Sequence, residues 1–168
     1  NALPVLSSLG FTSTTYFVAN QYDGSNVWDH EKGIPPSPLM SEDEIRQWVA
    51  AGQEAGAHTL DHVHLTRVDE AEARRQILQS RQKLESSLQT EVRAFCYPYG
   101  DENAAVRQLV AEAGYSNATT TEKGLALRTD DPFGLPRVTV SRSTNIVRFL
   151  QKCLTRLEDR RRHARHAR

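Results

Sequence analysis

The 168-residue sequence predicts a single α/β domain built on a largely parallel sheet. Segments with helical spacing of apolar residues alternate with short segments rich in β-branched and aromatic residues, as in α/β proteins. No internal repeat and no linker interrupts this alternation before the C-terminal tail. The length is about that of one domain, and it can bury a core without disulfides or a structural metal.

Four elements are expected in the first third of the chain. Residues 1–11 (NALPVLSSLGF) end a helix, because three leucines stand at helical spacing before a glycine. Residues 12–19 (TSTTYFVA) are rich in threonine, aromatic and β-branched residues and predict a strand. A loop with several prolines and glycines follows. Residues 41–56 then predict a helix that opens with Ser41 and Glu44, the residues of a capping box.

The rest of the chain continues the alternation. A long charged helix is expected to turn Ile77, Leu84 and Leu88 inward. We assign residues 1–155 to one domain and residues 156–168 to a basic, disordered tail. The expected elements are a helix over 69–89, a strand over 92–98, a helix over 103–114, strands over 115–121 and 135–141, and a helix from about Thr144 into the tail.

Composition excludes several kinds of protein. Lys plus Arg and Asp plus Glu both number 21, so the net charge indicates neither an acidic nor a basic partner. Cys96 and Cys153 form no CxxC motif and no disulfide framework, although a single bridge between them stays open. No apolar run approaches the roughly 20 residues of a membrane span. The terminal RRRHARHAR is interpreted as a solvated tail rather than a nucleic-acid-binding segment, since no aromatic residue interrupts its charges.

Three of the six histidines lie within seven residues of each other, in the segment EAGAHTLDHVHL. His58 and His62 stand four residues apart, a spacing at which two imidazoles can face one divalent ion. Taken alone, such a pair is more simply interpreted as two ordinary surface histidines. His64 is interpreted as a neighbour rather than a ligand, with a role in orienting a ligand or donating a proton left open.

A second segment, FCYPYGDEN, contains an aromatic-proline turn and a glycine that permits unusual backbone angles. Such a turn can aim a backbone N–H at a developing oxyanion, although a plain strand-to-helix connection explains it equally well. Each segment follows a short stretch of apolar or small residues and precedes a predicted helix. In α/β folds, functional groups gather at the carboxyl ends of strands, so the shared placement indicates an active site.

The two segments resemble the motifs of the polysaccharide deacetylases, the NodB-homology enzymes of carbohydrate esterase family 4. GAHTLDH is similar to their His-(Ser/Thr)-x-x-His motif, and RAFCYPYG to their Arg-x-Phe-x-x-Pro-Tyr-Gly motif. The likeness extends over about residues 2–150 and is strongest to the branch that deacetylates poly-N-acetylglucosamine. It implies a distorted (β/α) barrel with a divalent metal held by Asp-His-His, zinc by ligand type, with cobalt or nickel compatible.

The resemblance also implies roles for individual residues. His58 and His62 become the metal ligands, and Thr59 fixes the loop between them. The backbone N–H of Tyr99 becomes the oxyanion donor, in a turn that two further residues shape. Those two, Pro98 and Gly100, are expected to contact substrate. Trp28 is a weaker candidate for stacking on a sugar ring, and a tryptophan packed inward from a surface loop is an equally good interpretation.

The family's first motif, Thr-Phe-Asp-Asp-Gly, which supplies the base and the third metal ligand, has no match in the chain. We expect it, and the barrel's first strand, upstream of Asn1, so that this chain alone is inactive. Other aspartates are interpreted as loop carboxylates rather than substitutes. These are Asp61, Asp101, Asp130 and Asp131.

Two further positions depart from the family. Cys96 stands where many members carry an arginine that holds the base, and Arg137 is either its replacement or a surface residue. The family's Leu-x-His motif, which supplies the general acid, is also absent. His64 is a weak substitute, and the general acid stays unassigned.

The function implied is metal-dependent removal of N-acetyl groups from the amino sugars of a polysaccharide or glycolipid. The alternative is a non-catalytic protein of the same fold that binds metal or glycan. Family members of this kind work in the periplasm, in the cell envelope or outside the cell, but the chain shows no signal peptide that would assign a compartment.

Overall fold

The computed structural model describes residues 2–156 and 159. Five strands form one sheet in the order β1-β2-β3-β4-β5, and every neighbouring pair is parallel. The predicted α/β class is therefore confirmed. The elements are α1 (Ala2–Leu9), β1 (Thr14–Phe17), η1 (Val27–Lys32), α2 (Glu42–Ala50), β2 (Glu54–Ala57), α3 (Glu70–Leu88), β3 (Ala94–Cys96), η2 (Pro98–Gly100), α4 (Ala104–Glu112), β4 (Asn117–Lys123), β5 (Leu135–Arg137) and α5 (Ile146–Leu154).

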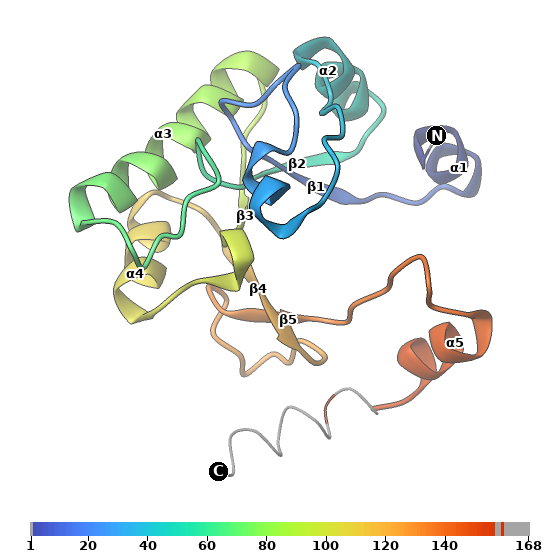
Figure 1. Cartoon of the computed structure of the whole chain (residues 1–168). Coiled ribbons are helices and arrows are strands. Elements are labelled where there is room, and N and C mark those ends of the chain that lie inside the picture. The colour runs from blue at the N-terminus through green and yellow to red at the C-terminus, as the bar shows by residue number, and fades with distance from the viewer. Residues whose placement is uncertain (1, 157–158, 160–168) are drawn as a thin grey trace.

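The helices are distributed unevenly about the sheet. In Figure 1, α2, α3 and α4 lie together on one side, whereas α1 and α5 stand away from the strands. Neither α1 nor α5 contains a buried residue. Within the described residues the sheet is not closed into a barrel, and β1 and β5 are its two edges. The predicted tail, residues 156–168, lies almost wholly outside the described residues.

The core fills the space between the sheet and these three helices. Ile77 and Leu84 of α3 are completely buried, and Leu88 is 8% exposed, so the predicted inward face of this helix is confirmed. Phe95 of β3 packs edge-on against Tyr97, with ring centroids 5.3 Å apart. The side chains that fix the sheet against the helices are therefore large and rigid, which favours one well-defined arrangement of the strand ends.

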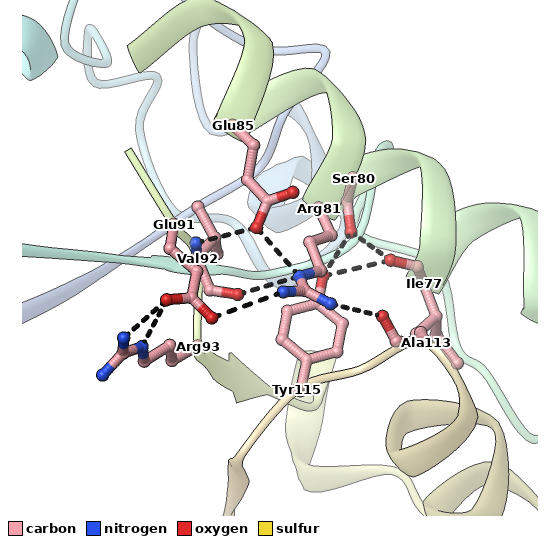
Figure 2. Close-up of polar contacts among 9 residues, drawn as sticks. All are labelled: Ile77, Ser80, Arg81, Glu85, Glu91, Val92, Arg93, Ala113 and Tyr115. Atoms are coloured by element: carbon pink, nitrogen blue, oxygen red, sulfur yellow. Dashed lines mark hydrogen bonds and ion pairs between the residues drawn. The ribbon is translucent and has the colours of Figure 1, made fainter. Parts of the chain in front are cut away.

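A polar network centred on Arg81 joins α3 to the segments that precede β3 and β4, at the amino end of the sheet (Figure 2). The guanidinium donates to the carbonyl of Val92 at 3.1 Å, to the carbonyl of Ala113 at 2.8 Å and to the carboxylate of Glu85 at 3.0 Å. It also lies over the Tyr115 ring, 5.7 Å from the centroid. One half-buried side chain thus joins α3, the approach to β3 and the end of α4.

The helix predicted over residues 41–56 was too long. The capping box at its start is present, but α2 ends at Ala50 and Gly52 turns the chain with φ +83°. Residues 54–57 (EAGA) form β2, an interior strand between β1 and β3. Their small side chains have low strand propensity, yet a Cβ on Gly56 would come within 2.5 Å of the Tyr16 ring. Close packing between neighbouring strands therefore selects small residues here, against local propensity.

Two other sequence questions are settled by the described residues. Cys96 is buried, Cys153 is exposed, and both are free thiols, so no disulfide joins them. None of the described helices combines the length and apolar character that crossing a bilayer requires.

Candidate metal and active site

The predicted site residues meet at the carboxyl edge of the sheet, where β2 ends before the histidine segment and β3 ends before η2. The ring centroids of His58 and His62 are 4.8 Å apart. The Tyr99 ring lies 4.7 Å from that of His62 and 3.9 Å from that of His64. Parallel strands bring these segments together because all their carboxyl ends lie on the same side.

The loop from residue 58 to residue 62 is held in an unusual backbone conformation. Thr59 has φ +67° and His62 has φ +60°, values that are rare for side chains of this size and for β-branched residues especially. The Thr59 hydroxyl accepts the N–H of His62 at 2.9 Å. The N–H of Ala19 donates to the Thr59 carbonyl at 3.0 Å, so the loop is also tied to the end of β1.

Both imidazoles are in the protonation state that binds metal. His58 Nδ1 lies 2.6 Å from the Cys96 carbonyl, which can only accept, so Nδ1 carries the proton and Nε2 keeps its lone pair. Burial lowers the pKa of His58 to about 4, and the charge of Arg137 acts in the same direction. Burial also lowers the pKa of His62 to about 4, with His58 adding to the effect. Both rings are therefore neutral at pH 7.

A divalent metal fits these two residues. His62 Nδ1 is buried without a hydrogen-bond partner in the described part of the chain, which is costly for a polar atom unless another ligand satisfies it. The described residues bring together no group of three or more His, Cys, Asp or Glu side chains that could hold a metal. The pair His58 and His62 thus offers two nitrogen donors, and a third protein ligand is not among the described residues.

The four aspartates interpreted as loop carboxylates all accept hydrogen bonds away from the histidine pair. Asp61 accepts from Asn20 at 2.7 Å, and Asp101 accepts from the Thr66 hydroxyl at 2.7 Å. Asp131 accepts from Arg107 at 3.0 Å, and Asp130 accepts a backbone N–H. Their hydrogen bonds support roles in shaping loops.

The turn that contains Tyr99 also has an unusual backbone conformation. Tyr99 has φ +60°, and no acceptor for its N–H is found among the described residues. Gly100 follows with φ +71°, and a Cβ there would come within 2.1 Å of the Thr121 hydroxyl. Only glycine fits this position, because both the backbone angle and the space exclude a side chain. Pro98, before it, is buried.

The loop segment η1 forms a wall of the site. Trp28 stacks on the His62 ring, with centroids 4.4 Å apart and an interplanar angle of 13°. Lys32 places its Nζ 4.4 Å from the centroid of the Tyr99 ring. A mainly apolar cavity of about 260 Å³ lies beside Trp28 and His58 and reaches Ile45. Sequence reasoning missed Lys32, because a charged residue in a polar loop carries no signal of its spatial neighbours.

Arg137 lies at the same edge of the sheet. Its Nε donates to the Thr120 carbonyl at 2.7 Å. Burial raises the pKa of the Cys96 thiol, and the positive charge of Arg137 opposes that rise. The guanidinium is thus near the position at which the resemblance expects an arginine, and its service to a catalytic base stays a prediction.

We predict that acid destabilises the metal-free chain between about pH 6.5 and about pH 4. An unfolded histidine has a pKa near 6.5, whereas His58 and His62 in the folded chain have pKa values of about 4. Between these values the unfolded state binds protons that the folded state does not. The contribution of the two neutral rings to stability is therefore fully present above pH 6.5 and is lost as the pH falls through this range, at about 1.4 kcal/mol for each unit by which one ring's pKa is lowered.

Urea unfolding at about pH 7.5 and about pH 4.5 measures this loss. The double variant His58→Gln, His62→Gln should lose clearly less stability over the same pH interval, because it lacks the two titrating rings. An equal loss in the two proteins would contradict the prediction.

Comparison with known proteins gives one family match and several similar folds. Residues 1–118 match the sequence profile of the family described as polysaccharide deacetylase. The Bacillus subtilis (strain 168) protein YxkH, provisionally named a polysaccharide deacetylase, is 23% identical over 141 residues, which are 84% of this chain and 46% of YxkH. The chain therefore spans less than half the length of this relative.

Solved structures show the same fold. The Streptococcus pyogenes deacetylase PplD, in complex with acetate, has a TM-score of 0.76 and 20% identity, over 90% of this chain and 62% of PplD. IcaB from Ammonifex degensii has a TM-score of 0.73 and 23% identity, over 85% of this chain and 62% of IcaB. The pseudoenzyme BA3943 of Bacillus anthracis, from carbohydrate esterase family 4, has a TM-score of 0.55 and 19% identity, over 70% of this chain and 36% of BA3943.

Proposed function

The chain belongs to the polysaccharide deacetylase family, and from this membership we propose that it forms the metal-binding part of an enzyme that removes N-acetyl groups from amino sugars. The observation that carries the proposal is the meeting of two neutral imidazoles, His58 and His62, with the strained turn at Tyr99. These are the elements that hydrolysis of an amide needs: metal donors and an N–H without a partner. The substrate class is an N-acetylated polysaccharide or glycolipid.

Each residue has a distinct part in this proposal. His58 and His62 would hold a divalent metal, zinc by ligand type, with cobalt or nickel compatible. Such a metal, when bound, would supply the Lewis acidity that water activation and polarisation of an acetamide carbonyl need. The N–H of Tyr99 would donate to the oxygen that becomes negative during attack, in a turn whose positive φ and lack of space at Gly100 admit only glycine.

The sugar-binding surface in this proposal is formed by η1 and η2. Trp28 already covers one face of His62, so a pyranose ring would meet the exposed part of the indole and the Tyr99 turn. Pro98 shapes that turn from below, where it is buried. Arg137 contributes positive charge that acts on His58, and it would favour the ionised form of an approaching carboxylate.

A second candidate function is binding of metal or glycan without turnover. It is favoured by the presence of only two metal donors among the described residues. The similar fold of BA3943, a pseudoenzyme of carbohydrate esterase family 4, shows that the fold is compatible with a lack of activity in that protein.

Acetate release separates the two candidates. We expect the protein that contains this chain, loaded with zinc, to release acetate from oligomers of N-acetylglucosamine. The variant His62→Ala should release at least about 1000-fold less, because a metal donor is lost. The variant Gln108→Ala, at an exposed position of α4 away from the site, is the control and should keep most of the activity. Zinc binding without acetate release from any such oligomer would support the non-catalytic candidate.

A further inference from the structure

A buried glutamine of α3 contacts the loop that carries the two histidines. Gln76 is 1% exposed and lies on the face of α3 that packs against the sheet. Its Oε1 accepts the backbone N–H of Leu60 at 3.0 Å and that of Asp61 at 3.0 Å. Both of these residues lie between His58 and His62. The glutamine therefore contacts the one segment whose shape sets the relative position of the two imidazoles.

The amide of Gln76 uses its full hydrogen-bonding capacity. Besides the two N–H groups on Oε1, its Nε2 donates to the Asp61 carboxylate at 2.7 Å and to the Glu72 carboxylate at 2.9 Å. An amide has two acceptor sites and two donor hydrogens, and all four are occupied here. A fully satisfied buried side chain of this kind holds its partners in one arrangement.

The loop needs such a partner. Its positive φ angles at Thr59 and His62 prevent a regular hydrogen-bonding pattern, so the N–H groups between them have no strand or helix to join. Leu60 is 3% exposed, and water is largely excluded from its N–H. Gln76 supplies the acceptor that the chain conformation leaves missing.

We propose that Gln76 is a positioning residue for the metal site: it holds the 58–62 loop in the conformation that presents both imidazoles to one ion. The proposal rests on the proposed metal-binding function of His58 and His62. Gln76 touches neither imidazole, and it acts through the backbone of Leu60 and Asp61. Outer partners of this kind tune metal affinity by holding the ligands in place.

Zinc titration calorimetry on the full chain tests the proposal. Gln76→Glu keeps the size and one accepting oxygen but turns the donor into an oxygen that faces the carboxylates of Asp61 and Glu72. We expect zinc affinity to fall about 10- to 100-fold. Gln79→Glu makes the same charge change at an exposed position of α3 and should leave the affinity unchanged. Unchanged affinity in a folded Gln76→Glu variant would overturn the proposal.

A reciprocal exchange distinguishes positioning from a general loss of stability. In the double variant Gln76→Glu, Asp61→Asn, the introduced side-chain amide donates to the introduced carboxylate, so the pair is restored with its roles reversed. The other carboxylate that contacts residue 76, that of Glu72, is already paired with Arg75 at 2.7 Å. We expect zinc affinity within about threefold of wild type, and a double variant as weak as the single one would count against the hydrogen-bond account.

A metal-free measurement separates this proposal from the proposed function. Gln76→Leu removes the acceptor, so hydrogen exchange at the amides of Leu60 and Asp61 should become at least about 10-fold faster, while exchange in β3 is retained. If the wild-type chain, with two metal donors among its described residues, binds no zinc, the metal site is tested in the protein that contains this chain, and the exchange result alone decides the role of Gln76. Unchanged exchange at both amides would then refute the positioning role.

Discussion

Zinc binding by this chain should weaken at least about 100-fold when His58 and His62 are both replaced by alanine. The ring centroids of the two imidazoles lie 4.8 Å apart. Both rings are neutral at pH 7, since burial lowers the pKa of each to about 4. The His58 ring is further oriented by its contact with the Cys96 carbonyl, which leaves Nε2 to bind metal. Each ligand lost removes a bond that water replaces only weakly.

Isothermal calorimetry with zinc measures this effect, and circular dichroism checks that the double variant is folded. The single variants should each be weaker than wild type and stronger than the double variant. His30→Ala is the matched control, because His30 lies in the wall of the site but is exposed and contacts neither ligand ring. Zinc affinity that survives in the double variant would place the metal elsewhere on the chain.

Replacing Arg81 by alanine should lower the free energy of unfolding by about 2 kcal/mol, because its removal takes a donor away from two backbone carbonyls and a carboxylate. Its side chain is 19% exposed, and it donates to the carbonyls of Val92 and Ala113, which joins α3 to both segments (Figure 2). Removal leaves those carbonyls and the Glu85 carboxylate without this donor. It also uncovers the face of Tyr115.

Urea unfolding gives the measurement, and Arg74→Ala is the matched control on the same helix. Arg74 pairs with Glu70 and Glu112, but its side chain is 47% exposed, so water replaces these contacts and little stability should be lost. Similar losses of unfolding free energy in the two variants would show that burial does not determine how much Arg81 stabilises the fold.

The regular elements could be predicted where local signals agree with tertiary packing. The predicted capping box of Ser41 and Glu44 is formed, because its hydrogen bonds depend only on neighbouring residues. β2 was missed because its residues, EAGA, are selected by the Tyr16 ring on the adjacent strand. No local pattern contains that contact.

The residues of the candidate site also fall into two groups, those that the local sequence could identify and those that it could not. His58, His62 and Tyr99 could be selected from the sequence because a motif and its spacing lie within a few consecutive residues. Gln76 and Lys32 could not, since each acts on a segment that is distant along the chain. A glutamine in a charged helix and a lysine in a polar loop are ordinary until their neighbours are known.

The sequence by itself thus determined the α/β class, the long helices and the two short segments that carry the predicted chemistry. Only the tertiary structure decided that these segments meet, since the parallel order of β2 and β3 places both of their carboxyl ends at one edge. It alone showed Trp28 against His62 and Gln76 beneath the loop. The physical reason is range: capping, turns and periodicity act over a few residues, whereas a site is assembled by packing between residues far apart in the chain.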